Sequence, residues 1–198
     1  MPGMLIVLIL ITVPFSVLAH PHVFIEAEAE LVFEQGVPDS IITRWRFDDF
    51  FSRMILLDFA GGSTENLNRE NIEAIRKGAF ENLSNYNYFF HVLIDGRELT
   101  ITDIRDFNVL LDGRSMIYEF RIPLRQPGGP GIARLAETGT IVIGIYDKSY
   151  FSHVEYSVPP IVFGGEVPPG ARADMRERPD RRYYFNLIVP RMIHVEWS

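Results

Sequence analysis

Apolar and polar residues alternate with a period of two near the start of the chain. From Val23 to Phe33 every second residue is apolar, and most of the residues between them are glutamate. This alternation predicts a β-strand with one buried and one exposed face. His20 and His22 stand directly before the strand and fall on its exposed face.

A second alternating run predicts the partner of this strand. Residues 41–47 alternate after a turn at residues 35–40, so the two runs predict a β-hairpin. In antiparallel pairing the glutamates of the first strand lie opposite Arg44 and Arg46. Asp48, at the end of the second strand, then arrives near the two histidines.

The period becomes helical after this hairpin. Asp48 and Asn68 are capping residues, each followed by apolar residues at helical spacing, and Gly61-Gly62 separates the two runs. We therefore predict a two-helix insertion over about residues 48–84.

Strand patterns return after the insertion and dominate the rest of the chain. Residues 166–182 are polar, charged and proline-rich, which predicts a mobile surface loop. The whole pattern predicts a β-dominated α+β domain, either an antiparallel sandwich or a curled sheet. The predicted strands cover residues 88–94, 99–111, 115–123, 140–146, 151–158, 183–189 and 191–197.

The first residues read as a targeting segment. Residues 4–18 are apolar and uncharged, and small residues precede a cleavage position after Ala19. We predict a signal peptide over residues 1–19 and one β-rich domain over residues 20–198. The segment lacks a lysine or arginine before its apolar part, so an uncleaved N-terminal anchor stays open as the alternative.

Composition narrows the compartment and the partners. The chain has 19 Lys and Arg against 26 Asp and Glu, a net charge of −7, which argues against nucleic acid or anionic lipid as a partner. Cysteine is absent, which excludes disulfides and thiolate chemistry. Together with the predicted signal peptide, this composition favours export to a bacterial periplasm.

The new N-terminus created by cleavage is a candidate transition-metal site. His20 would offer an α-amine and an imidazole, and His22 adds a second imidazole, a set of nitrogen ligands that suits Zn(II), Ni(II) or Cu(II). Pro21 has no amide hydrogen and so prevents the usual amino-terminal chelate. The alternative is an exposed strand start that binds no metal.

Three further residues are candidate ligands for this site. Asp48 arrives beside the histidines, although a helix cap explains it equally. Asp147 opens a turn after a buried run, where an Asx-turn is the alternative. His153 shares a strand face with Ser149 and could reach a site near Asp147.

Five short motifs give the chain a family resemblance. Together they resemble the DUF1007 family over most of residues 20–158. The motifs are HPHVF at 20–24, W-x-F-D-x-x-F at 45–51, Y-x-Y-F-x-H at 86–91, YEF-x-I-P-L at 118–124 and Y-D-x-S-Y-F at 146–151.

The resemblance implies an exported bacterial protein of an uncharacterised transport system. Members are similar to proteins found alongside nickel, cobalt or zinc permeases, and the family has no established enzymatic activity. Many relatives carry a calcium-type loop between the two helices. This sequence has Ala60, Gly62, Thr64 and Asn71 at the corresponding ligand positions, so the resemblance does not extend to calcium binding.

The function predicted from these features is non-enzymatic, because the chain lacks the G-x-S-x-G, H-E-x-x-H and phosphate-loop motifs. We predict a periplasmic accessory or binding protein of a Zn, Ni, Co or Cu transport or homeostasis system, with an inner-membrane permease as partner. One alternative is a metal-free module that docks on a permease through Phe24, Trp45 and Tyr150. The other is a copper oxidase in which His20 forms one arm of a histidine brace.

Overall fold

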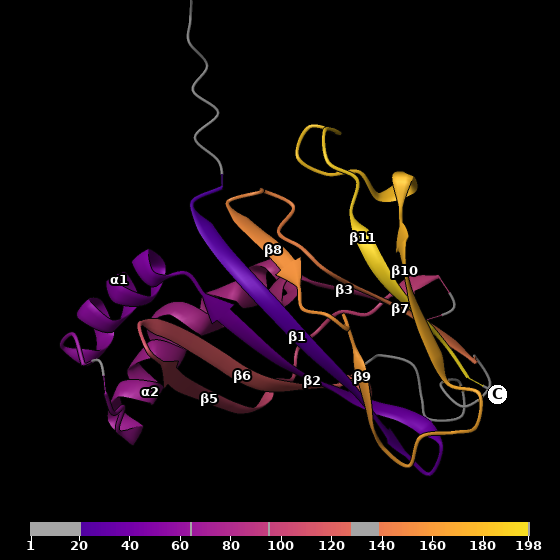
Figure 1. The fold of residues 1–198 in the computed structure, drawn as a ribbon, viewed down its shortest axis with the longest axis horizontal. Helices are drawn as coiled ribbons and strands as arrows, with labels where there is room; N and C mark the ends of the chain where they lie inside the picture. The colour runs from indigo at the N-terminus through magenta and orange to yellow at the C-terminus, as the bar shows by residue number, and fades with distance from the viewer. Residues whose placement is uncertain (1–20, 64, 95, 128–138, 198) are drawn as a thin grey trace, which may run out of the picture.

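Two β-sheets packed face to face form the body of the protein (Figure 1). The computed structural model describes residues 21–63, 65–94, 96–127 and 139–197. The first sheet has the order β5 (Arg105–Asp112), β6 (Ser115–Pro123), β2 (Val37–Phe47), β1 (Val23–Glu34) and β8 (Ser152–Tyr156), with β9 (Val162–Gly165) also paired to β1. The second has the order β10 (Arg172–Glu177), β11 (Arg191–Glu196), β7 (Thr140–Ile145), β3 (Phe90–Ile94) and β4 (Arg97–Glu98). The predicted β-dominated α+β sandwich is confirmed.

The predicted hairpin is formed by β1 and β2. Every second residue of β1 from Val23 to Phe33 is buried, as the alternation requires. The antiparallel register places Glu26 opposite Arg46 and Glu28 opposite Arg44. The ion pairs of these arginines nevertheless go to other strands, where Arg44 contacts Glu119 at 2.5 Å and Arg46 contacts Asp112.

Aromatic side chains fill the space between the sheets. Trp45 of β2 stacks on Phe90 of β3 with ring centroids 5.9 Å apart, and Phe33 of β1 meets Trp197, just after β11, at 6.0 Å. These contacts join the two sheets directly. Because Trp45 is fully buried here, it does not belong to the exposed docking surface predicted for it.

The helical insertion lies at one end of the first sheet (Figure 1). α1 (Asp49–Ala60) is capped by Asp48, and α2 (Arg69–Ile75) begins with a capping box between Asn68 and Asn71. Helical turns then continue as η1 (Arg76–Phe80) and η2 (Glu81–Phe89), so the insertion ends later than the predicted residue 84.

An asparagine explains the later end of the insertion. Asn87 adopts a left-handed conformation, and its side-chain amide bonds the backbone of Phe90, Leu99 and Ile101 at 2.7, 3.1 and 2.7 Å. β3 accordingly begins at Phe90 rather than at the predicted residue 88, and β5 begins at Arg105 rather than at the predicted residue 99.

The prediction for residues 166–182 was wrong, because β10 and the short turn η3 (Pro179–Arg181) lie within them. Among the described residues β10 pairs with β11 alone, at the edge of the second sheet, and most of its side chains are exposed, so no apolar alternation marks it. Charged neighbours accompany the pairing, with Arg172 and Glu196 2.5 Å apart.

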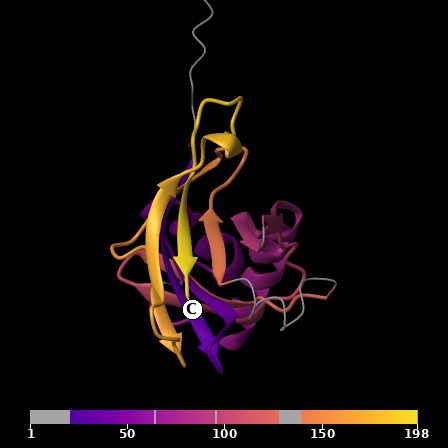
Figure 2. The same ribbon diagram turned by 90° about the vertical axis from the view of Figure 1, so that its right-hand side faces the viewer.

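The strand predicted over 183–189 is also wrong. Within this segment the structure has a single bridge between Tyr183 and Ile188, and Tyr184 to Asn186 all have positive φ. The segment instead connects β10 and β11 at the end of the sandwich where β1 begins (Figures 1 and 2).

The predicted signal peptide and His20 lie outside the described residues. Within the part of the chain that is described, no helix is both long enough and apolar enough to cross a membrane.

Candidate functional site

His22 lies at the start of β1, beside the parallel strand β8. Its backbone N–H donates to the Phe151 carbonyl at 2.8 Å, and the rings of the two residues are 5.0 Å apart. Phe24 pairs directly with His153, with ring centroids 6.0 Å apart. His22, Phe24 and His153 therefore belong to one end of the first sheet.

Asp48 is close to this end, as predicted, but its carboxylate serves the backbone. Oδ2 accepts a hydrogen bond from the Phe24 N–H at 2.9 Å, and Oδ1 accepts one from the Phe51 N–H at 2.8 Å. One residue thus fastens the first turn of α1 to the edge of β1. This arrangement accounts for an aspartate at this position without a metal ion.

Asp147 is the centre of the loop between β7 and β8. Its buried carboxylate accepts bonds from the Ser149 N–H at 2.8 Å, the Ser152 N–H at 3.0 Å, and the Ser149 hydroxyl, which is 2.7 and 2.8 Å from the two oxygens. These bonds form the Asx-turn that the sequence allowed as its alternative. Asp147 therefore shapes the loop that presents Tyr150 and Phe151.

An imidazole–carboxylate pair lies at this end. His153 Nε2 lies 3.3 Å from Glu155 Oε1, a neighbour that the strand period alone could have indicated. Among the residues described, no three His, Asp or Glu side chains are arranged to hold a metal ion. Of the five predicted ligands, the structure brings His22, Asp48 and His153 to one region, whereas Asp147 serves its own loop.

Aromatic rings, three of them exposed and two partly exposed, surround this region, and we call them the aromatic end. His153 is 5.9 Å from the ring of Tyr150, which is 5.3 Å from Tyr184. Phe24 is 52% exposed, Phe151 48% and Phe185 86%. The aromatic end consists of Phe24, Tyr150, Phe151, Tyr184 and Phe185. The sequence did not mark Tyr184 and Phe185 as surface residues, because they fall in the segment predicted to be a strand.

His91 is buried next to the same end and links the second sheet to the β10–β11 connection. Its Nδ1 is 2.6 Å from Glu98 Oε1, and its Nε2 is 3.2 Å from the Tyr146 carbonyl oxygen. Glu98 also binds Arg181 at 2.9 Å. Burial lowers the pKa of His91, although the bonds to Glu98 and Tyr146 oppose this shift.

The stability of the protein should depend on pH through His91. A histidine whose pKa is lowered by folding contributes stability above its unfolded pKa of about 6.5 and loses it as the pH falls below that value. We expect the free energy of unfolding to fall between pH 7 and pH 5, and His91→Gln to flatten that dependence. His194→Gln is the matched comparison and should remove less of the slope, because His194 is only partly buried. Urea unfolding across this range measures the effect, and an unchanged slope in His91→Gln would contradict it.

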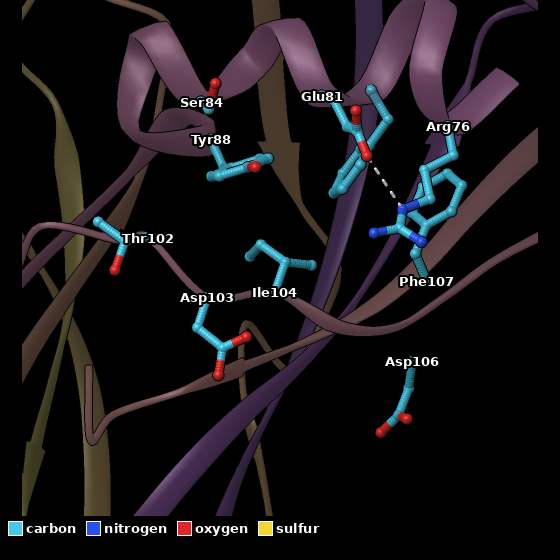
Figure 3. Close-up of a pocket in the computed structure, with 10 residues that line it drawn as sticks. Arg76, Glu81, Ser84, Tyr88, Thr102, Asp103, Ile104, Asp106 and Phe107 are labelled. Carbon is cyan, nitrogen blue, oxygen red and sulfur yellow. Dashed lines mark ion pairs between the residues drawn. The ribbon is translucent and has the colours of Figure 1, made fainter. Parts of the chain in front are cut away.

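A polar surface pocket of about 440 Å³ lies between the helical turns η1 and η2 and the segment that leads into β5 (Figure 3). Arg76 and Glu81 come from its helical wall, 3.3 Å apart, and Asp103 and Asp106 come from the segment opposite. Asp103 pairs with Arg105 at 2.8 Å and Asp106 with Arg121 at 3.2 Å. Its charged groups therefore compensate one another, and we assign the pocket no chemistry.

Comparison with known proteins places the chain in a family. A family model described as a protein of unknown function, DUF1007, matches residues 5–179. The chain belongs to the DUF1007 family. The match includes His20, His22, Asp48, Asp147 and His153, the five predicted ligands.

This DUF1007 protein is similar to two curated relatives. It is 26% identical over 131 residues to an uncharacterized 15.5 kDa protein in the trpE 3′ region of Spirochaeta aurantia, a match covering 64% of this chain and 86% of the relative. It is 22% identical over 148 residues to an uncharacterized protein of Haemophilus influenzae, covering 73% of this chain and 66% of the relative. Neither relative has a name that states an activity.

Proposed function

We propose that this DUF1007 protein is a periplasmic, non-enzymatic accessory protein of a transition-metal transport or homeostasis system. It holds Zn(II), Ni(II) or Cu(II) at its N-terminal His20-Pro21-His22 segment. An inner-membrane metal permease is its partner.

The observation that carries this proposal is the exposure of His22 at an end of the sheet that also bears His153 and Glu155. A nitrogen-rich site with one carboxylate suits Zn(II), Ni(II) and Cu(II). Because the described residues alone make no three-ligand group, the site requires the imidazole and the α-amine of His20. In this proposal Asp48 and Asp147 do not bind the metal directly but hold the neighbouring backbone, since their oxygens already accept backbone hydrogen bonds.

The aromatic end supports a second candidate, a metal-free module that docks on a permease. Phe24, Phe151 and Phe185 are exposed around the start of β1, and aromatic side chains are enriched in protein interfaces. In this version the exposed rings bind the permease, and the histidines only complete the surface.

Metal content separates the two candidates. Protein exported and cleaved in its native compartment is expected to carry about one equivalent of Zn, Ni or Cu by elemental analysis. The same protein with a methionine retained ahead of His20 should carry much less, because the α-amine then lies one residue away. Metal-free protein in both preparations would favour the docking module, and copper with reductant-driven turnover would favour the oxidase.

A further inference from the structure

α1 carries a row of apolar side chains on its solvent side. Phe50 is 77% exposed, Met54 42% and Leu57 57%. Their spacing of four and then three residues places them in one line along the helix. Single exposed apolar side chains are normal on a protein surface, whereas a contiguous apolar patch marks an interaction site. We call these three residues the α1 ridge.

The α1 ridge points away from the body of the protein. The buried residues of α1 lie on the opposite side of the helix, and these are Ser52, Ile55, Leu56 and Ala60. Ser52 fixes this orientation, because its hydroxyl oxygen accepts a hydrogen bond from the Met116 N–H of β6 at 2.9 Å. α1 also lies at the outer edge of the molecule (Figure 1), so another molecule can approach the ridge.

The α1 ridge has the spacing of a coiled-coil seam. In a heptad repeat, whose positions are labelled a to g, the apolar positions a and d follow one another at spacings of three and four residues. Phe50 and Leu57 occupy d positions, and Met54 occupies the a position between them. Arg53 then falls on the adjoining g position and Asp58 on the adjoining e position. The ridge is therefore flanked by a basic residue on one side and an acidic residue on the other.

These flanking charges select a second copy of the chain as the partner. Both side chains are exposed, and neither Arg53 nor Asp58 has an ion-pair partner among the described residues. In a parallel coiled coil a g residue faces the e residue five positions later on the other helix, and Arg53 and Asp58 are five positions apart. A parallel second copy therefore places Asp58 of the partner subunit beside each Arg53. An antiparallel copy would bring like charges together instead.

We propose that the protein forms a parallel, two-fold symmetric dimer through the α1 ridge, with ion pairs between Arg53 and Asp58 of the partner subunit. A two-fold interface uses the same patch on both subunits, and the ridge with its two flanking charges is complementary to itself. Because α1 has only 12 residues, the contact is small, and the dimer should dissociate on dilution. It does not depend on the proposed metal site.

Charge reversal tests the dimer and its orientation together. Sedimentation equilibrium of the chain that begins at His20, in EDTA so that metal does not link molecules, is expected to show monomer and dimer between micromolar and millimolar concentrations. Arg53→Glu and Asp58→Lys should each raise the dimer dissociation constant about tenfold, because each replaces two opposite-charge pairs with two like-charge pairs. The double variant should return to within about threefold of the wild type, because both pairs are restored in the reverse sense.

Two further variants separate the interface from other effects. Met54→Lys places two like charges at the centre of the seam and should leave only monomer. Its unfolding curve should stay close to that of the wild type, because Met54 is already 42% exposed. Arg97→Glu is the same reversal at an exposed residue of β4 in the second sheet, and it should dimerise as the wild type does.

Four results would overturn the proposal. A monomer at every concentration would mean that the α1 ridge has another occupant, such as a helix of the permease. A dimer that appears only without EDTA would belong to the metal site. A dimer unchanged by Arg53→Glu and Asp58→Lys would use another surface, and a double variant no better than the single ones would contradict the parallel arrangement.

Discussion

Replacing Asp147 with alanine is expected to lower the free energy of unfolding by about 3 kcal/mol. The buried carboxylate is the acceptor for the Ser149 and Ser152 N–H groups and for the Ser149 hydroxyl. Its removal leaves donors near the start of β8 without a partner, and bonds to a charged acceptor are worth more than neutral ones. Chemical denaturation of the metal-free protein measures the loss.

The matched control for this change is Glu155→Ala. Glu155 is an exposed carboxylate of β8, and its removal should change the free energy of unfolding by less than about 0.5 kcal/mol. If Asp147→Ala unfolds like the wild type but loses metal, Asp147 is a metal ligand and its role as the organiser of the loop is wrong.

The fold was predictable wherever one face of an element is buried. In β1 the alternating burial from Val23 to Phe33 follows the sequence residue by residue. The pairing of β1 with β2 was predicted as well, but β2 begins at Val37, so the turn is shorter than the predicted residues 35–40, and the register shifts between Val32 and Phe33. The caps at Asp48 and Asn68 were also visible, because side-chain oxygens at helix starts have a local signature.

The unpredicted elements depend on contacts between distant parts of the chain. β10 is an edge strand whose partner β11 supplies the pairing, so its charged sequence resembles a loop. The parallel pairing of β1 with β8 brings residues 23–27 beside 152–156, and no short-range pattern encodes it. Trp45 was assigned to a surface for the same reason, since Phe90 of the second sheet and Phe89 of the helical insertion, both distant in sequence, stack on it.

The candidate site was predicted in part. The approach of Asp48 to the start of β1 followed from the hairpin, and the structure confirms it with the bond to Phe24. The use of both Asp48 oxygens by backbone N–H groups could not be inferred from residue type. The metal ligands themselves stay a prediction, because His20 lies outside the described residues.

His22→Ala is expected to abolish metal binding with little loss of stability. The side chain is exposed at the start of β1, and the core face of that strand does not include it. Removing the His22 imidazole leaves the amine and the imidazole of His20 without the second imidazole of the proposed site. Glu28→Gln is the control, because Glu28 is another exposed residue of the same strand and should bind metal as the wild type does.

Calorimetric titration of Zn(II), Ni(II) and Cu(II) into the chain that begins at His20 tests the metal proposal most directly. The wild type and Glu28→Gln are expected to bind about one equivalent of at least one of these ions with micromolar or tighter affinity. His22→Ala should show no binding at the same concentrations, and its unfolding curve should overlay that of the wild type. Equal binding by wild type and His22→Ala, or no binding by either, would contradict the account and leave the aromatic end as a metal-free docking surface.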